Sequence, residues 1–106
     1  MSTVGSEQTR DAIREVLRLP IDSRLVGNVG RLSEEKGLDI LVTAIGILSY
    51  SDVHLVLAGS GPIRTKLEKL AIDTGVQARV HFLGYCKHVD WIYDDLDVYV
   101  QPSRFE

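Results

Sequence analysis

The sequence of 106 residues predicts an α/β domain with a doubly wound parallel sheet of about four strands. Three observations lead to this fold class. Short apolar runs typical of buried strands recur along the chain, helical stretches of roughly 10–15 residues separate them, and glycines stand where strand gives way to helix. The expected order is a helix, three strand–helix units and a final strand, and helices between short strands call for right-handed crossovers and a parallel sheet.

The first two predicted elements are a helix over 6–18 and a strand over 25–29. Ser6 is a suitable N-cap for the helix, and Pro20 ends it. The apolar residues of this helix have i, i+3, i+4 spacing; they are Ile13, Val16 and Leu17.

A second helix is expected to start near Gly37, followed by a strand over 53–59. The helix has apolar residues at i, i+3, i+4 and i+7, which are Leu41, Ala44, Ile45 and Leu48. The run "VHLVLAG" is continuously apolar, as expected of a strand that is buried on both faces.

The third predicted helix has Pro62 at its first position, where the missing N–H costs nothing, and Gly75 as its C′ residue. Its apolar face is formed by Ile63, Leu67, Leu70 and Ala71. A strand over 79–84, a short helix and a strand over 97–101 follow. The apolar residues of the short helix are Val89, Ile92, Tyr93 and Leu96.

Bulk properties exclude several functional classes. The net charge of −3 argues against a nucleic-acid surface, which needs a basic patch. Cys86 is the single cysteine, so an intramolecular disulfide is impossible. The first ten residues lack the apolar region of a signal peptide, and the stretch 38–48 is shorter than the roughly 20 residues that span a bilayer. A soluble, cytoplasmic protein is the expectation.

Ligands of open α/β sheets bind beyond the carboxyl ends of the strands. The candidate site is therefore formed by the strand-end loops, which are 30–37, 59–62, 84–87 and 102–106. In the first of them Gly30 allows a close backbone approach, and Arg31 and Lys36 offer positive charge to a phosphate. The alternative is that both cations face solvent and pair with Glu34 and Glu35, and on this loop alone that alternative is favoured. The glycines of "GSGP" and "LGY" are equally compatible with simple tight turns.

Other familiar sites do not fit the sequence. The first loop lacks G-x-G-x-x-G and the second strand lacks a terminal acid, which excludes a dinucleotide fold, and no phosphate-loop motif is present. The histidines (His54, His81 and His88) lack metal-ligand spacing; His54 and His81 lie in predicted strands, where we expect them to be packed or hydrogen-bonded. Trp91 and Tyr93 are interpreted as packing residues of the short helix, and Cys86 has no activating base in view.

Four motifs together resemble the carboxy-terminal, donor-binding domain of the retaining group 1 glycosyltransferases, which have the GT-B fold with Rossmann-like domains. The motifs are "VGNVGRLSEEKGLDILVTAI", "HLVLAGSGPIRTKLEKLA", "RVHFLGY" and "DLDVYVQPSRFE". They occur in family order and spacing from about Leu25 to the last residue, and the preceding helix also fits. The resemblance implies a partial nucleotide-sugar-binding domain, with 1–24 as leading helix and linker and 25–106 as strand–helix repeats.

The resemblance also implies roles for individual residues. Arg31 and Lys36, with Gly30, would hold the diphosphate of a nucleotide-sugar donor, and this outweighs the solvated alternative. Glu106 matches the first Glu of the family's E-x₇-E element, close to the transferred sugar, and is the candidate catalytic residue. The loops near the nucleotide base would contribute Gly59, Gly61, Gly84, Tyr85 and Cys86. Two fixed cations would stabilise the leaving diphosphate, so no metal and no other cofactor is expected.

The implied enzyme is a hexosyl-type transferase, and we expect these 106 residues to be only part of it. The second Glu of E-x₇-E, the helix that follows and the amino-terminal acceptor domain would lie outside the chain, which alone is expected to be inactive and to bind donor weakly at best. We assign any peripheral membrane association to the full enzyme only. An unpaired fourth-strand edge favours self-association. The alternative functions are a non-catalytic module that binds a nucleotide or a partner through that edge, and an epimerase or phosphorylase with the GT-B fold.

Overall fold

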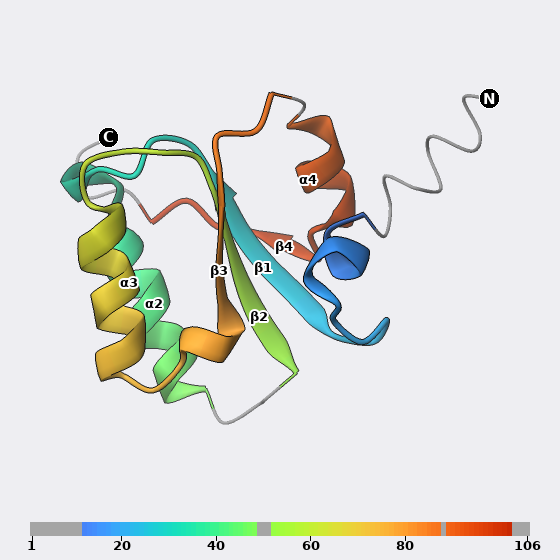
Figure 1. Ribbon diagram of the computed structural model, residues 1–106, viewed down its shortest axis with the longest axis horizontal. Coiled ribbons are helices and arrows are strands. Elements are labelled where there is room, and N and C mark those ends of the chain that lie inside the picture. The colour runs from blue at the N-terminus through green and yellow to red at the C-terminus, as the bar shows by residue number, and fades with distance from the viewer. Residues whose placement is uncertain (1–11, 49–51, 88, 103–106) are drawn as a thin grey trace.

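A computed structural model describes residues 12–48, 52–87 and 89–102 and confirms the predicted α/β fold (Figure 1). Its single sheet has four parallel strands in the order β3-β2-β1-β4. The strands are β1 (Arg24–Val29), β2 (Val53–Ala58), β3 (Val80–Gly84) and β4 (Val98–Tyr99). The helices are α2 (Leu38–Ile47), α3 (Arg64–Asp73) and α4 (Asp90–Asp95), with 3₁₀ turns η1 (Glu34–Lys36) and η2 (Gln77–Arg79).

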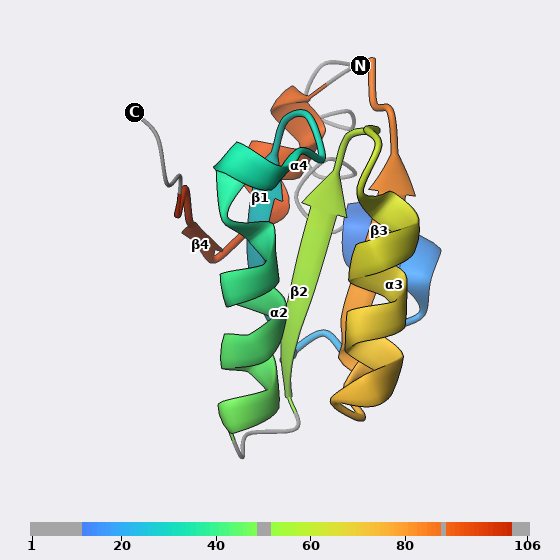
Figure 2. The ribbon, with the colours of Figure 1, turned by 90° about the vertical axis from the view of Figure 1, so that its left-hand side faces the viewer.

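Helices cover both faces of the sheet, so the molecule has three layers. Figures 1 and 2 show α2 and α3 side by side on one face, while α4 and the helical residues 12–17 lie on the other. The chain builds β1, β2 and β3 outward in one direction and then returns to place β4 on the other side of β1. The strand order therefore reverses between β1 and β4, which is where an open α/β sheet binds its ligands.

The core lies on both sides of β2, whose six residues are all buried. On the α2–α3 face Leu55 and Leu57 pack among the helix side chains, and on the opposite face Val56 and Ala58 pack against residues of the first helix and α4. The prediction that "VHLVLAG" is a strand buried on both faces is thus confirmed.

Some residues that were predicted to lie on the buried faces of the helices are exposed. In α2 the buried stripe is formed by Leu38, Leu41, Val42 and Ile45, whereas the predicted Ala44 and Leu48 are exposed. Leu48 is exposed because it lies beyond the end of α2, and Ala44 lies on the solvent side of the stripe that Leu38, Leu41, Val42 and Ile45 form. In the first helix Ile13 is buried, but Val16 is 75% exposed, and the predicted start at Ser6 is outside the described residues.

Two further corrections concern the second half of the chain. Pro62 does not occupy the first helical position, because the N–H of Ile63 bonds to the carbonyl of Leu32 and α3 begins only at Arg64. The fourth strand is shorter than 97–101 and pairs with β1 at two positions. Such a short edge strand offers little surface for pairing between copies.

Trp91 and Tyr93 were expected to pack, but they are 53% and 46% exposed. Since α4 has six residues, it presents one narrow face to the sheet, with Ile92 and Asp95 buried. The ring of Tyr93 instead lies against that of Tyr99, with 5.2 Å between the centroids.

A buried charged network ties the first helix to the amino end of the sheet. The guanidinium of Arg14 donates to Asp95 (2.6 Å), Asp97 (2.9 Å) and the carbonyl of Ser23 (2.9 Å). The Asp95 carboxylate is fully buried and also accepts the N–H of Ile13. The network joins the first helix, the start of β1 and the loop before β4, segments up to 83 residues apart in sequence.

We predict that Arg14→Ala destabilises the fold by about 3 kcal/mol or more, because it removes the ion-pair partner of a buried carboxylate. Urea unfolding measures the change. The matched control is Arg24→Ala, since the Arg24–Asp52 pair is exposed and 3.8 Å long and should be worth only about 0–1 kcal/mol. Equal losses for the two variants would contradict the assigned role of the network.

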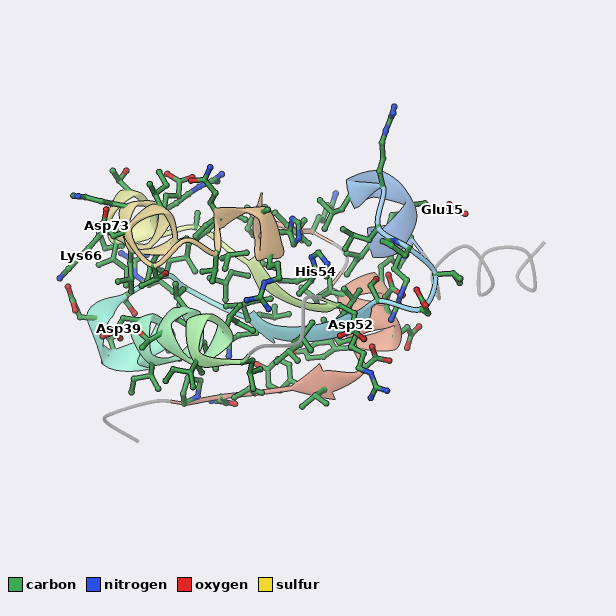
Figure 3. All side chains as sticks on the ribbon, turned by 90° about the horizontal axis from the view of Figure 1, so that it is seen from below. Glu15, Asp39, Asp52, His54, Lys66 and Asp73 are labelled. Atoms are coloured by element: carbon green, nitrogen blue, oxygen red, sulfur yellow. The ribbon has the colours of Figure 1, made fainter. Side chains whose placement is uncertain are left out.

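His54 and His81 form a hydrogen-bonded pair between the amino-terminal halves of β2 and β3, which confirms the expectation that they are packed or hydrogen-bonded. His54 Nδ1 and His81 Nε2 are 2.9 Å apart, and the rings are stacked with 5.1 Å between centroids. Figure 3, seen from the amino ends of the strands, shows His54 near the middle of the sheet. Asp52 lies at the same, amino-terminal end of β2. Burial lowers the pKa of both rings; the charge of Arg79 adds to this for His54, and Asp52 opposes it.

We therefore predict that the free energy of unfolding falls as pH decreases from 7.5 to 5.5. The folded-state pKa values lie below the ordinary value of 6.5, so the neutral pair contributes stability above that pH and this contribution is lost on acidification. Urea unfolding at several pH values measures the slope. A His54→Gln/His81→Gln variant should have a smaller slope, and an unchanged slope would refute the assignment.

Candidate functional site

At the carboxyl edge of the sheet, the loop after β1 (30–37, the first loop) and the loop after β2 (59–63, the second loop) are joined through their backbones. The N–H of Leu32 donates to Ser60 (2.9 Å), and the carbonyl of Leu32 accepts from Ile63 (3.3 Å). The side chain of Leu32 is buried in the core beneath the loops. Leu32 thus fixes the first loop in place and leaves the neighbouring Arg31 at the surface.

Two glycines of the second loop make this contact possible. A Cβ on Gly59 would overlap the carbonyl oxygen of Gly30, and one on Gly61 would overlap that of Leu32. The φ angle of Gly59 is +144°, which side chains rarely adopt. Glycine is therefore required here because two loops touch, a reason that the sequence motif did not reveal.

The loop after β3 (85–87, the third loop) completes a pocket of about 290 Å³ with the other two. Of the predicted site residues, Gly30, Arg31, Gly59, Tyr85 and Cys86 line it. Sequence reasoning missed its remaining lining residues, which are Val29, Ala58, Ser60 and Val89. Val29 and Ala58 end their strands and Ser60 lies within "GSGP", so position alone could have identified them.

The other predicted site residues lie elsewhere. Gly61 and Gly84 do not line the pocket: Gly61 contacts the first loop, and Gly84 accepts a hydrogen bond from the N–H of Gly59 (2.7 Å). Lys36 lies on η1, next to Gly37, where a Cβ would overlap the carbonyl oxygen of Pro102. It thus lies on the side of the first loop that meets the end of the described chain. Glu106 and His88 are outside the described residues.

The charges of the first loop are arranged differently from the solvated alternative. Glu34 pairs with Lys66 of α3 (2.7 Å), and over 12–48, 52–87 and 89–102 neither Arg31 nor Lys36 forms an ion pair. Hydrogen bonding to the backbone lowers the pKa of Glu35, and the charges of Lys36 and Arg31 act in the same direction. The exposed guanidinium of Arg31 is therefore available to an anionic ligand.

The described residues show neither an activated cysteine nor a metal site. Burial raises the pKa of the Cys86 thiol, so the thiol is protonated at neutral pH and is not an activated nucleophile. In the part of the chain that the structure describes, no three His, Cys, Asp or Glu side chains gather as a metal site would need. A helix that could cross a bilayer is likewise not found among the described residues.

A second pocket of about 330 Å³ lies between the first helix and α4. Its walls are almost entirely apolar, and the lining residues include Ile13, Val16, Leu83 and Trp91. Among the described residues that line it, Lys87 is the charged one. Cys86 lines both pockets. We call this second pocket the apolar groove, and it has no arrangement of cations comparable to the first loop.

Comparison with known proteins shows which family the chain belongs to. The family model for "Glycosyl transferases group 1" matches residues 9–106, which is nearly the whole chain. This chain belongs to the group 1 glycosyltransferase family. An uncharacterized glycosyltransferase of Methanocaldococcus jannaschii is 39% identical over 88 residues, which cover 80% of this chain and 23% of that protein.

Solved structures of glycosyltransferases share the fold. Alr3699/HepE of Anabaena, in complex with UDP and glucose, matches with a TM-score of 0.81 at 24% identity over 91% of this chain and 27% of that one. The carboxy-terminal domain of the group 1 protein LpcC of Francisella tularensis matches with a TM-score of 0.77 at 21% identity, over 92% of this chain and 54% of that one. The chain spans less than a third of the length of the curated relatives that it matches. The predicted GT-B carboxy-terminal fold is thus confirmed.

We predict that Gly59→Ala lowers the stability of the folded chain much more than Gly75→Ala does. Both glycines have positive φ, but a Cβ at Gly75 meets nothing within 4 Å. Gly75→Ala should therefore cost only the strain of a left-handed alanine, about 1–2 kcal/mol. Thermal unfolding compares the two variants, and equal shifts in Tm would show that the contact between the first two loops is unimportant.

Proposed function

We propose that this chain is the donor-binding part of a retaining glycosyltransferase and that it binds the diphosphate and nucleotide of a nucleotide diphosphate sugar. The observation that carries the proposal is the pocket at the carboxyl edge of the sheet. Arg31, which has no ion-pair partner among the described residues, lines it next to the backbone of Gly30 and Gly59. A guanidinium suits phosphate oxygens because its planar N–H groups bind two of them at once.

The proposed roles follow from position. Arg31 and Lys36 hold the diphosphate from the two sides of the first loop, and Gly30 lets the ligand approach the backbone. Tyr85 is 78% exposed at the rim of the pocket, where its ring and the adjoining backbone of Gly84 and Cys86 would face the nucleotide base. The hydroxyl of Ser60 is a further polar group at this edge.

The proposed chemistry is transfer of the sugar to an acceptor with retention at the anomeric carbon. The bond between this carbon and the diphosphate oxygen breaks, and its electron pair stays on the diphosphate. The positive charges of Arg31 and Lys36 stabilise the negative charge that develops there, which is how preorganised electrostatics lowers a barrier. The acceptor hydroxyl attacks from the face of the departing diphosphate, which takes up the proton, and Glu106 would lie close to the sugar.

The whole enzyme would need parts that these residues do not supply. An amino-terminal acceptor domain would close over the carboxyl edge and bring the acceptor to the donor. We therefore propose donor binding, and not transfer, as the property to test on this chain. Because the Anabaena protein was solved with UDP and glucose, UDP and UDP-glucose are the first probes to use.

We predict that Arg31→Ala and Lys36→Ala each weaken UDP binding by about 10- to 100-fold, the value expected when a hydrogen bond between charged groups is removed. Isothermal titration with UDP and UDP-glucose measures the affinity. The matched controls are Arg24→Ala, at the amino end of the sheet, and Lys69→Ala, whose partner is Asp73 on α3. If both site variants bind UDP as tightly as the unmodified chain, the diphosphate assignment is wrong.

A further inference from the structure

Strands β1 and β4, between which the strand order reverses, are paired over a short length beside the first loop. We call this boundary between β1 and β4 the seam. The ladder between the two strands consists of Val26 with Val98 and Gly27 with Tyr99, whereas β1 and β2 pair at six positions. Beyond Tyr99 the segment 100–102 continues alongside the first loop and leads to Glu106 in the sequence. What holds this segment in place therefore sets its distance from Arg31.

Asn28 is a buried amide at this seam. It is 4% exposed, and its Nδ2 donates a 2.7 Å hydrogen bond to the carbonyl oxygen of Val100. Apart from the exposed Arg24, the rest of β1 is apolar or glycine. An apolar side chain would fill this site without the cost of burying an amide, and the pairing of β1 with β2 uses backbone groups alone. The amide is thus specific to the contact with Val100.

The same side chain also borders the first loop. Asn28 Oδ1 is 3.9 Å from the position that a Cβ on Gly30 would take, and Arg31 follows directly. At the other end of the first loop, Gly37 packs against the carbonyl oxygen of Pro102, so closely that a Cβ would overlap it. Further contacts are the Val100 N–H to Gly27 (2.9 Å) and the Tyr99 hydroxyl to Val29 (3.3 Å). Asn28 thus bonds from the buried side of β1 to segment 100–102.

The geometry points to Asn28 as a positioning residue that fixes segment 100–102 against the first loop. Its amide extends the pairing of β1 and β4 beyond the two-residue ladder. In the donor site, and resting on the function proposed above, this sets the spacing between Arg31 on the first loop and segment 100–102. Asn28 itself need not touch the donor.

Amide hydrogen exchange of the unmodified chain, Asn28→Leu and Asn28→Asp tests the positioning role. In Asn28→Leu the Val100 N–H should exchange about tenfold faster or more, while Leu55 and Leu57 of β2 keep their protection, since the loss is local. Asn28→Asp has the same shape, but its ionised carboxylate cannot donate to Val100. Because burial raises the pKa of a carboxyl group, the local loss should appear once the pH is high enough to ionise it, and protection, relative to the unmodified chain, should return when acid protonates it.

The control is Leu25→Ala, which removes a fully buried side chain of the same strand and should raise exchange across the whole sheet. Val100 protection that is unchanged in both Asn28 variants would overturn the proposal. So would a loss spread over the whole sheet, as in the control, or an Asn28→Asp variant that acid does not restore.

Titration with UDP then separates the two proposals. Local loosening at Val100 together with at least about fivefold weaker UDP binding supports the positioning role in the donor site. Loosening with unchanged UDP affinity overturns the link between Asn28 and the site. If the unmodified chain fails to bind UDP while Val100 still loosens, the proposed function fails and the structural role of Asn28 stands.

Discussion

The contact between the first and second loops is the constraint on which the rest of the carboxyl edge depends. Gly59 lies against Gly30 and Gly61 against Leu32, so two strand-end loops approach more closely than any side chain would allow. Leu32 is buried as a consequence, and Arg31 is left at the surface beside the pocket. The position of the candidate phosphate-binding cation is therefore set by backbone packing and not by an ion pair of its own.

The two ends of the sheet have different roles. At the amino end, Arg14, Asp95 and the pair of His54 and His81 join distant segments through buried polar contacts whose partners all belong to the chain. At the carboxyl edge, glycines, an exposed arginine and an exposed tyrosine surround an open pocket. The buried charged network and the candidate ligand-binding groups are thus separated by the length of the strands.

The sequence predicted the order and nature of the elements because its strands are short apolar runs and its helices have a clear period, and the four-stranded parallel sheet followed from that order. It did not predict contacts that depend on tertiary packing. Arg14 and Asp95 are 81 residues apart, and no local pattern joins them. Arg31 lines the pocket and Lys36, which lies on η1, does not, and the roles predicted for both stay predictions. The role of Asn28 was not predicted, because a single polar residue within a strand forms no repeating pattern that would mark its contact with Val100.

The proposed function requires a diphosphate to bind at the edge formed by the first and third loops. The most direct measurement is NMR chemical-shift mapping of the ¹⁵N-labelled chain during titration with UDP. We expect saturable shifts at Gly30, Arg31, Gly59 and Tyr85, with little change at the amino end around His54. Shifts confined to the apolar groove around Ile13 and Trp91, or the absence of any shift at millimolar UDP, would contradict the account.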